Sequence, residues 1–204
     1  MIDIGNSLIN SSFVKVSSLD ETNMQQTGFY CIKLKEGHKF PNAKYQTLYK
    51  QRKDRIIYVG IAYSQNLSER LVKGELRGEK AATFFRDIGT ILQYQPIKRK
   101  GNSKSSISNY TFSTQNIQDI RLWINDNLEV NYVPFEGEKK MLEEIETDII
   151  KKYVPFLNIK NNPQRLQELK FDRKQYREKL KKEMSENNRK VWNIVSSYSI
   201  IRNS

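Results

Sequence analysis

The chain has 204 residues, of which 35 are Lys or Arg and 23 are Asp or Glu, which gives a net charge of +12. The hydrophobic fraction of 37% is enough for one core, and no apolar run approaches the ~18 residues of a membrane span. The lone cysteine, Cys31, excludes an intrachain disulfide framework and a multi-cysteine zinc site. The positive charge favours a polyanionic partner such as nucleic acid.

The first part of the chain predicts an arm followed by two strands. Residues 1–26 are polar and mixed, and we expect an N-terminal arm that lies on the domain. Residues 27–35 and 55–62 are short β-prone runs, each typical of a strand. The polar residues 36–54 between them fit a long connection or an extended hairpin. Such a pair of strands is expected to be antiparallel, with its tyrosines near one another.

Helical patterns follow the second strand. Asn66 and Glu69 have the spacing of a capping box, which predicts the start of a helix. Residues 81–92 and 116–128 repeat apolar residues at helical spacing and predict two more helices. Between these two lies the segment 98–106, with four basic residues, no acid, and several Gly and Ser residues. It is typical of a mobile basic loop.

The last elements complete the expected fold. Residues 129–134 predict a third strand, and residues 138–153 predict a helix that Pro155 ends. Residues 164–204 carry eleven basic and five acidic residues and predict a helical extension with an apolar end. We therefore expect an α/β (α+β) fold with a small three-stranded antiparallel sheet flanked by helices. The expected divisions of the chain are an arm (1–26), a domain (27–163) and a basic helical extension (164–204).

One glutamate stands out on the helix predicted for residues 138–153. At ~100° per residue, Glu146 falls within an apolar arc. The arc consists of Met141, Leu142, Ile145, Ile149, Ile150 and Tyr153. No Lys or Arg lies three or four residues from Glu146, and an ionised carboxylate is rarely buried without a partner or a metal. The pattern leaves two readings open: pairing with a distant arginine, or a role as metal ligand or catalytic carboxylate.

Five sequence elements, taken in order, resemble one known family. They are Gly28-Phe29-Tyr30, Tyr58-Val59-Gly60, Arg70, Glu146 and Pro155-Phe156-Leu157-Asn158. In that order they resemble the GIY-YIG nucleases, and the resemblance covers residues 27–163. It implies a small metal-dependent domain that cuts phosphodiester bonds.

The resemblance also implies roles for individual residues. Glu146 would hold one divalent cation, Mg²⁺ or Mn²⁺. Arg70 would neutralise the charge that develops on the phosphate. Tyr30 would activate the attacking water, and Tyr58 would orient that water or the scissile phosphate. Asn158 would organise the site; a turn-forming role after Pro155 is the alternative.

The proton acceptor is the part of the site that the motifs leave open. Strand tyrosines most often pack with the hydroxyl at the rim, and a free phenol with a pKa near 10 is a poor base. Tyr30 would need the metal and Arg70 nearby to lower its pKa. Some relatives have a histidine one turn after the arginine, but Gly74 occupies that place. The only histidine, His38, lies in the connection between the strands, so Lys73 is the nearer candidate for proton transfer.

Further segments extend the resemblance and suggest a nucleic-acid surface. Leu76-Arg77-Gly78 and Thr83-Phe84-Phe85-Arg86 resemble a bacterial branch that includes restriction-enzyme-like members. The helix of residues 164–190 is expected to contact phosphates, which position DNA but do not read its sequence. The other expected phosphate contacts are Arg77, Lys80, Arg86, Lys98, Arg99, Lys100 and Lys104.

The sequence thus predicts a cytoplasmic, divalent-metal-dependent DNA endonuclease with a restriction-type or other genome-defence or repair role. The start of the chain lacks a signal-peptide pattern, and we expect no membrane contact and no small-molecule cofactor. Two alternatives stay open: a non-catalytic nucleic-acid-binding module on the same fold, and an interaction module that docks through the C-terminal helix. The sequence does not decide between a monomer and a homodimer.

Overall fold

The computed structural model describes residues 3–101 and 104–201, with side chains described as far as Glu186 except that of Lys104. At its centre is an antiparallel sheet with the strand order β1-β4-β2-β3. The strands are β1 (Val14–Lys15), β2 (Gly28–Leu34), β3 (Ile56–Ala62) and β4 (Leu128–Pro134). The expected α/β class, the three strands and the antiparallel pairing of β2 with β3 are confirmed.

The fourth strand comes from the N-terminal arm. β1 is only two residues long and pairs with β4 through Val14 opposite Val130. A run this short has no periodicity, so the sequence pattern did not reveal it. The arm also contains helix α1 (Ile4–Asn10) and the 3₁₀ turn η1 (Val16–Ser18), regular structure that the sequence pattern did not indicate.

The connection between β2 and β3 is neither plain loop nor hairpin. It contains helix α2 (Ala43–Lys50), which begins at Asn42, whose side chain accepts hydrogen bonds from the Lys44 and Tyr45 amides. The helix buries Tyr45 and Tyr49 against the core. These two tyrosines lie four residues apart on one face, a spacing that the Gly and Pro residues upstream obscured.

Apart from α4, the remaining helices match the expected ones, with shifted ends. They are η2 (Ser68–Leu76), α3 (Thr83–Ile91), α4 (Lys104–Ser108), α5 (Thr114–Asn127), α6 (Lys139–Tyr153) and α7 (Gln167–Ile201). The helix α4 lies in the segment that we expected to be a loop. Asn66 does accept a hydrogen bond from the Glu69 amide, but the Glu69 carboxylate pairs with Lys73 and Lys80. Only half of the capping box therefore forms.

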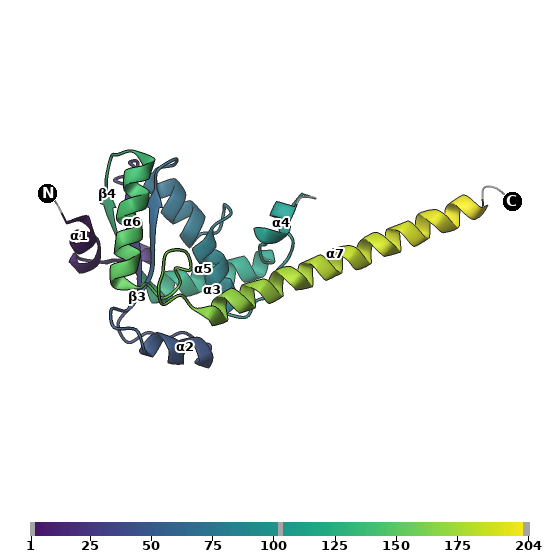
Figure 1. Ribbon diagram of the computed structural model, residues 1–204, viewed down its shortest axis with the longest axis horizontal. Helices are drawn as coiled ribbons and strands as arrows, with labels where there is room; N and C mark the ends of the chain where they lie inside the picture. The colour runs from purple at the N-terminus through teal and green to yellow at the C-terminus, as the bar shows by residue number, and fades with distance from the viewer. Residues whose placement is uncertain (1–2, 102–103, 202–204) are drawn as a thin grey trace.

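The sheet separates two apolar cores. Helices α1 and α6 cover one face, where Phe29 and Cys31 of β2 are buried (Figure 1). The alternate residues Tyr30 and Ile32 face the larger core, which η2, α3, α5 and the start of α7 complete. Because successive side chains of a strand point to opposite faces, both faces of β2 are apolar and the strand is central. Met141, expected in the buried arc of α6, is 49% exposed, because only the stripe through Leu142, Ile149 and Ile150 packs inward.

Helix α7 is anchored to the domain at its start and projects from it (Figure 1). Leu169 and Leu180 are buried, and Arg173 forms an ion pair with Asp87 of α3 at 3.3 Å. Asp87 is fully buried, and this burial raises its pKa to about 7 although Arg173 and Arg86 oppose the shift. Within the described part of the chain, every helix is too short or too polar to cross a bilayer.

We expect Arg173→Met to destabilise the protein more at pH 8 than at pH 5. The folded-state pKa of Asp87 is raised, so the stability linked to its protonation is complete below its ordinary pKa and is lost as the pH rises through about 7. At pH 8 the variant leaves a buried carboxylate without this partner, a loss on the order of 2–4 kcal/mol. Urea unfolding at both pH values measures the difference.

The control for this experiment is Lys174→Met, which removes an exposed cation from the same helix. It should change the free energy of unfolding little at either pH. Equal losses for Arg173→Met at pH 5 and pH 8 would contradict the role of the ion pair.

Candidate active site

The helix η2 is a π-helix, and its winding builds one side of the site. Its end bonds the Arg77 amide to the Val72 carbonyl, five residues back, at 2.9 Å. In an α-helix, residues five apart would point about 140° away from one another. The i→i+5 winding instead brings Arg70 against Glu75, whose Oε1 lies 2.7 Å from Arg70 Nη2. π-Helical turns are rare and often mark functional sites.

Glu75 joins three elements although its side chain is fully buried. Its Oε1 also accepts a hydrogen bond from the Tyr30 hydroxyl at 3.3 Å, and its Oε2 accepts one from the Phe84 amide at 2.9 Å. Burial raises the pKa of Glu75 above its ordinary value, while Arg70 and the Phe84 amide oppose the shift. The sequence patterns did not point to Glu75. An α-helical projection does not pair it with Arg70, but a glutamate among the apolar residues of η2 was an available signal.

The two signature tyrosines lie side by side on the sheet face opposite α6. Tyr30 on β2 and Tyr58 on β3 stack with ring centroids 6.3 Å apart. The signature glycines have steric causes. Gly60 is paired opposite Tyr30, and a Cβ at Gly60 would overlap the Tyr30 hydroxyl. A Cβ at Gly28 would overlap the carbonyl of Val133 on β4, so both glycines allow close approach.

Four of the predicted site residues meet at one cavity of about 330 Å³. They are Tyr30, Tyr58, Arg70 and Glu146. The end of β3, the loop after it and Glu143 of α6 complete the lining. The cavity therefore brings together one phenol each from β2 and β3, a guanidinium from η2 and two carboxylates from α6.

The protonation of the cavity residues follows from burial. Burial raises the pKa of Tyr30 and of Tyr58 well above that of a free phenol, and Glu75 adds to the effect on both. Both phenols are thus neutral at physiological pH. Burial works against the charge of Arg70, but the acidic groups around it, Glu75 among them, outweigh this effect and leave the pKa of Arg70 above its usual value. Arg70 is a permanent cation at the cavity wall.

Glu146 is half-buried and faces the cavity. Burial raises its pKa to about 7, although the charges of Lys160 and Arg70 oppose the shift. Within residues 3–101 and 104–186, no hydrogen bond or ion pair holds its carboxylate. The sequence left two readings open for Glu146. The first, pairing with a distant arginine, is not supported, because no described arginine contacts the carboxylate directly.

The donor set of the cavity suits a hard divalent cation. Glu146 and Glu143 both line it, and the described residues contain no group of three or more His, Cys, Asp or Glu that would form a closed metal site. Mg²⁺ is commonly bound by one or two carboxylates, with waters and substrate phosphates as its other ligands. A carboxylate with a raised pKa and no direct partner fits such a ligand.

Asn158 does not line the cavity but holds the strand beside it. Its side chain accepts from the Val59 amide at 2.9 Å and donates to the Val59 carbonyl at 2.8 Å. Val59 lies between Tyr58 and Gly60 on β3, the last strand of the sheet. Asn158 thus satisfies backbone groups at the edge of the sheet, and the geometry favours a site-organising role over a turn-forming one.

Lys73 and His38 are not brought to the cavity. The ammonium group of Lys73 pairs with Glu69, and Lys73 is not among the residues of the lining. His38 lies in a different cleft, where its Nδ1 is 2.9 Å from Asn127 Oδ1. A side chain at Gly74 would start 4.0 Å from Arg70 Nη1, so this position does adjoin the site.

Three expected phosphate contacts near η2 have different environments. Arg77 pairs with Glu21 at 2.6 Å, and Lys80 pairs with Glu69; both remain partly exposed. Arg86 is only 6% exposed, and its guanidinium lies 5.9 Å from the centre of the Tyr110 ring. It is enclosed by the core, so our expectation of direct phosphate contact is not supported for Arg86.

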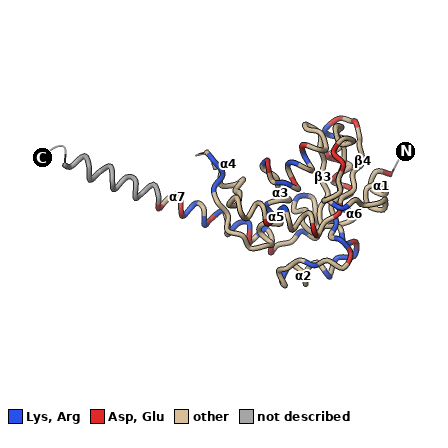
Figure 2. The backbone as a smooth tube through the Cα atoms, turned by 180° about the vertical axis from the view of Figure 1, so that it is seen from behind, with Lys and Arg blue, Asp and Glu red and all other residues tan. Residues whose placement is uncertain are grey.

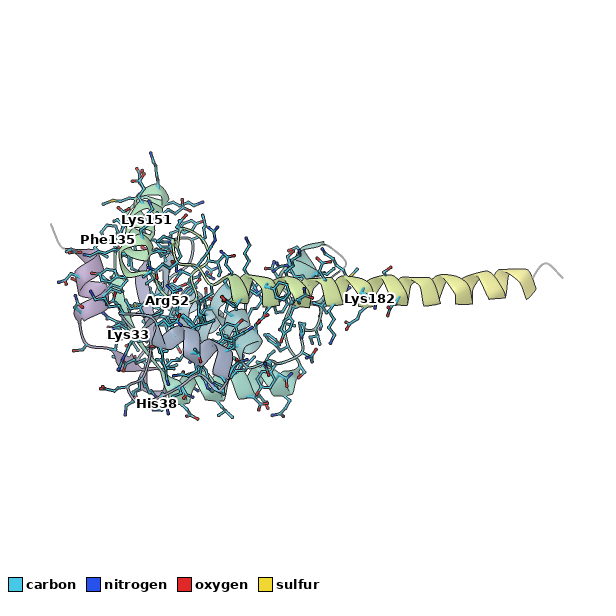
Figure 3. All side chains as sticks on the ribbon, turned by 60° about the horizontal axis from the view of Figure 1, so that its bottom comes forward. Lys33, His38, Arg52, Phe135, Lys151 and Lys182 are labelled. Carbon is cyan, nitrogen blue, oxygen red and sulfur yellow. The ribbon has the colours of Figure 1, made fainter. Side chains whose placement is uncertain are left out.

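The expected contacts of the basic segment lie at the α4 end of the molecule. Lys100 is exposed, while Lys98 and Arg99 are half-buried and the Arg99 amide bonds to the Ser106 carbonyl at 3.2 Å. Lys104 begins α4, and its side chain is outside the described part. Figure 2 shows Lys and Arg positions along α4 and the described part of α7, and Figure 3 places Lys182 on the projecting part of α7.

A comparison with protein-family models now places the chain in a class. The model of the GIY-YIG catalytic domain matches residues 28–189, a range that includes β2, β3, β4 and the whole lining of the cavity. The chain therefore belongs to the GIY-YIG family, whose domain is that of a nuclease-type endonuclease. The searches of curated proteins and of solved structures find no match. The division into arm, domain and extension remains a prediction.

We expect Glu146→Gln to stabilise the metal-free protein at pH 8 but not at pH 4. The folded-state pKa of Glu146 is raised to about 7, so the stability linked to its protonation is lost as the pH rises through that value. A neutral amide removes this loss, which is on the order of 1–3 kcal/mol. Thermal unfolding without metal measures it, with Glu144→Gln on the exposed side of α6 as the control.

The same pair of variants tests the ligand assignment. Added Mg²⁺ should raise the unfolding temperature of the unchanged protein and of Glu144→Gln, because a ligand of the folded state stabilises it. Glu146→Gln should not respond. A lower stability of Glu146→Gln at pH 8 without metal would show that its carboxylate is well accommodated, contrary to our view.

We expect Asn158→Ala to weaken both the fold and the site. It leaves the amide and carbonyl of Val59 unpaired at a buried edge, a loss of about 1–3 kcal/mol in the free energy of unfolding. Urea unfolding measures the loss, and Asn125→Ala on the exposed face of α5 is the matched control. Similar stabilities of the two variants would contradict the edge-holding role.

Proposed function

We propose that the protein is a divalent-metal-dependent endonuclease that hydrolyses phosphodiester bonds of DNA. The observation that carries this proposal is the convergence of Tyr30, Tyr58, Arg70 and Glu146 on one cavity. These residues come from four elements and are up to 116 positions apart in the chain. Packing alone does not require two phenols, a guanidinium and a half-buried carboxylate to share a cavity.

Each cavity residue has a task in this reaction. Arg70 is fixed by Glu75 and presents its remaining N–H groups to a phosphate, whose negative charge grows during attack. Tyr30 and Tyr58 are neutral and orient the attacking water and the scissile phosphate through their hydroxyls. Glu146 would hold Mg²⁺ or Mn²⁺. When bound, such a cation withdraws charge from the phosphate.

DNA as the substrate is supported by charge. The net charge of +12 favours a polyanion, and Arg77, Lys80, Lys98 and Lys100 offer partly exposed cations. We further propose a restriction-type or other genome-defence or repair role, a cytoplasmic location and a homodimer. A reducing compartment fits the single buried cysteine, and two-strand cutting of a palindrome would fit a two-fold dimer.

Cleavage of supercoiled plasmid with Mg²⁺ or Mn²⁺ tests the proposal. We expect the unchanged protein to produce nicked and linear DNA, and Glu146→Gln to lower the rate at least ~10²-fold. Arg70→Lys should also lower it, because an ammonium keeps the charge beside Glu75 but lacks the guanidinium fork. Discrete fragments would indicate a restriction-type specificity, and a smear would indicate a nonspecific nuclease.

Glu144→Gln serves as the matched control and should cleave at the normal rate. If the unchanged protein fails to cut DNA both with Mg²⁺ and with Mn²⁺, the enzyme proposal fails. If Glu146→Gln cuts as fast as the control, the proposed metal ligand is wrong.

A further inference from the structure

Among the described residues that line the cavity, none is an obvious acceptor for the proton of the attacking water. Burial raises the pKa of Tyr30, so this phenol is already protonated and cannot itself be the final acceptor of the proton. Glu146 is the proposed metal ligand, and Glu143 lies 3.7 Å from the ammonium of Lys139. Lys73 is paired with Glu69 outside the lining, and the only histidine lies in another cleft.

Glu75 lies directly behind Tyr30, out of reach of solvent. Its Oε1 is 3.3 Å from the Tyr30 hydroxyl, which donates to it, and the Phe84 amide fixes the other oxygen. The Tyr30 hydroxyl therefore stands between the cavity and a buried carboxylate. The arrangement is a two-step path for a proton, from the cavity to the phenol and from the phenol to the carboxylate.

We propose that Glu75 is the terminal proton acceptor of the cleavage reaction and acts through Tyr30. This inference rests on the proposed endonuclease function. Because Glu75 does not touch the substrate, it is a positioning residue that also stores the proton. It takes the place in this chain that a histidine near Arg70 would otherwise fill.

The step balances in atoms and charge. One O–H bond of water breaks and its proton moves to the Tyr30 oxygen, while the Tyr30 proton moves to Glu75 Oε1. The water oxygen forms a bond to phosphorus, and the bond from phosphorus to the 3′ oxygen breaks, with its electron pair on that oxygen. The leaving oxygen takes a proton from solvent in the cavity. Glu75 later returns its proton through Tyr30 to solvent.

The surroundings of Glu75 suit this exchange. Burial raises its pKa and makes it a stronger base than an exposed glutamate, while Arg70 keeps it ionised before attack. The charged or titratable groups that face it come from four elements. They are Arg70 of η2, Arg86 and Asp87 of α3, Tyr30 of β2 and Tyr58 of β3.

The pH profile of Glu75→Gln tests the proposal. The amide preserves the shape of the side chain and an oxygen that can accept from Phe84 or Tyr30, but it cannot take up a proton. Plasmid cleavage is measured on the full chain between pH 5.5 and pH 9 at saturating Mg²⁺, which keeps Glu146 ionised. The rate of the unchanged protein should fall as the pH decreases through the pKa of Glu75. In Glu75→Gln the rate should drop ~10²-fold or more at neutral pH, and the acidic fall should disappear.

Two further variants separate proton transfer from structural support. Glu75→Asp keeps a carboxylate and should retain the acidic fall at a reduced rate. Tyr30→Phe interrupts the path, so adding Glu75→Gln to it should slow cleavage little further. Thermal unfolding shows which variants fold. If Glu75→Gln does not fold, a Tyr30→Phe rate near that of the unchanged protein would overturn the inference on its own.

The outcomes distinguish this inference from the proposed function. Suppose that the unchanged protein cleaves DNA. A normal cleavage rate in Glu75→Gln, or a loss of rate that is equal at every pH, would then overturn the role of Glu75 and leave the endonuclease function standing. Independent, multiplicative losses in the double variant would overturn the path through Tyr30. No cleavage by the unchanged protein would overturn both.

Discussion

The burial of the Glu75 carboxylate is the constraint on which the site depends. A buried charge is tolerated only when donors surround it, and this one receives Arg70, the Phe84 amide and the Tyr30 hydroxyl. Each donor comes from a different element, so satisfying the carboxylate fixes the positions of η2, α3 and β2 relative to one another. The π-helical winding of η2 is part of the same solution, since it turns Arg70 toward Glu75.

The opposite wall of the cavity is held by the sheet edge. Asn158 pairs with both backbone groups of Val59 and thereby fixes the strand that carries Tyr58. Helix α6 lies across the other face of the sheet and brings Glu146 to the end of β3. Tyr30 and Arg70 are thus held by Glu75, whereas no described residue forms a hydrogen bond or ion pair with the Glu146 carboxylate. A half-buried carboxylate without a direct partner suits a cation that keeps several waters.

The sequence predicted the parts of the molecule that depend on long patterns or on motif order. The strands that carry Tyr30 and Tyr58, and the helix that carries Glu146, followed from apolar periodicity. The sequence did not reveal β1, because this strand is too short to show a period. It also did not reveal Glu75, because this residue pairs with Arg70 only in a π-helix. The burial of Arg86 beside Tyr110 did not follow from the sequence either, because charge alone does not show that a side chain is enclosed.

The buried acids also explain how the site and the projecting helix are linked. Arg86 and Asp87 follow Phe84 closely on α3, and both interact electrostatically with Glu75, while Asp87 pairs with Arg173 of α7. Charges in a shared low-dielectric interior influence one another over longer distances than in water. A change in the docking of α7 would thus alter the field at Glu75 without any contact in the cavity. The ion pair between Arg173 and Asp87 thus links the start of α7 electrostatically to the buried acids beside the cavity.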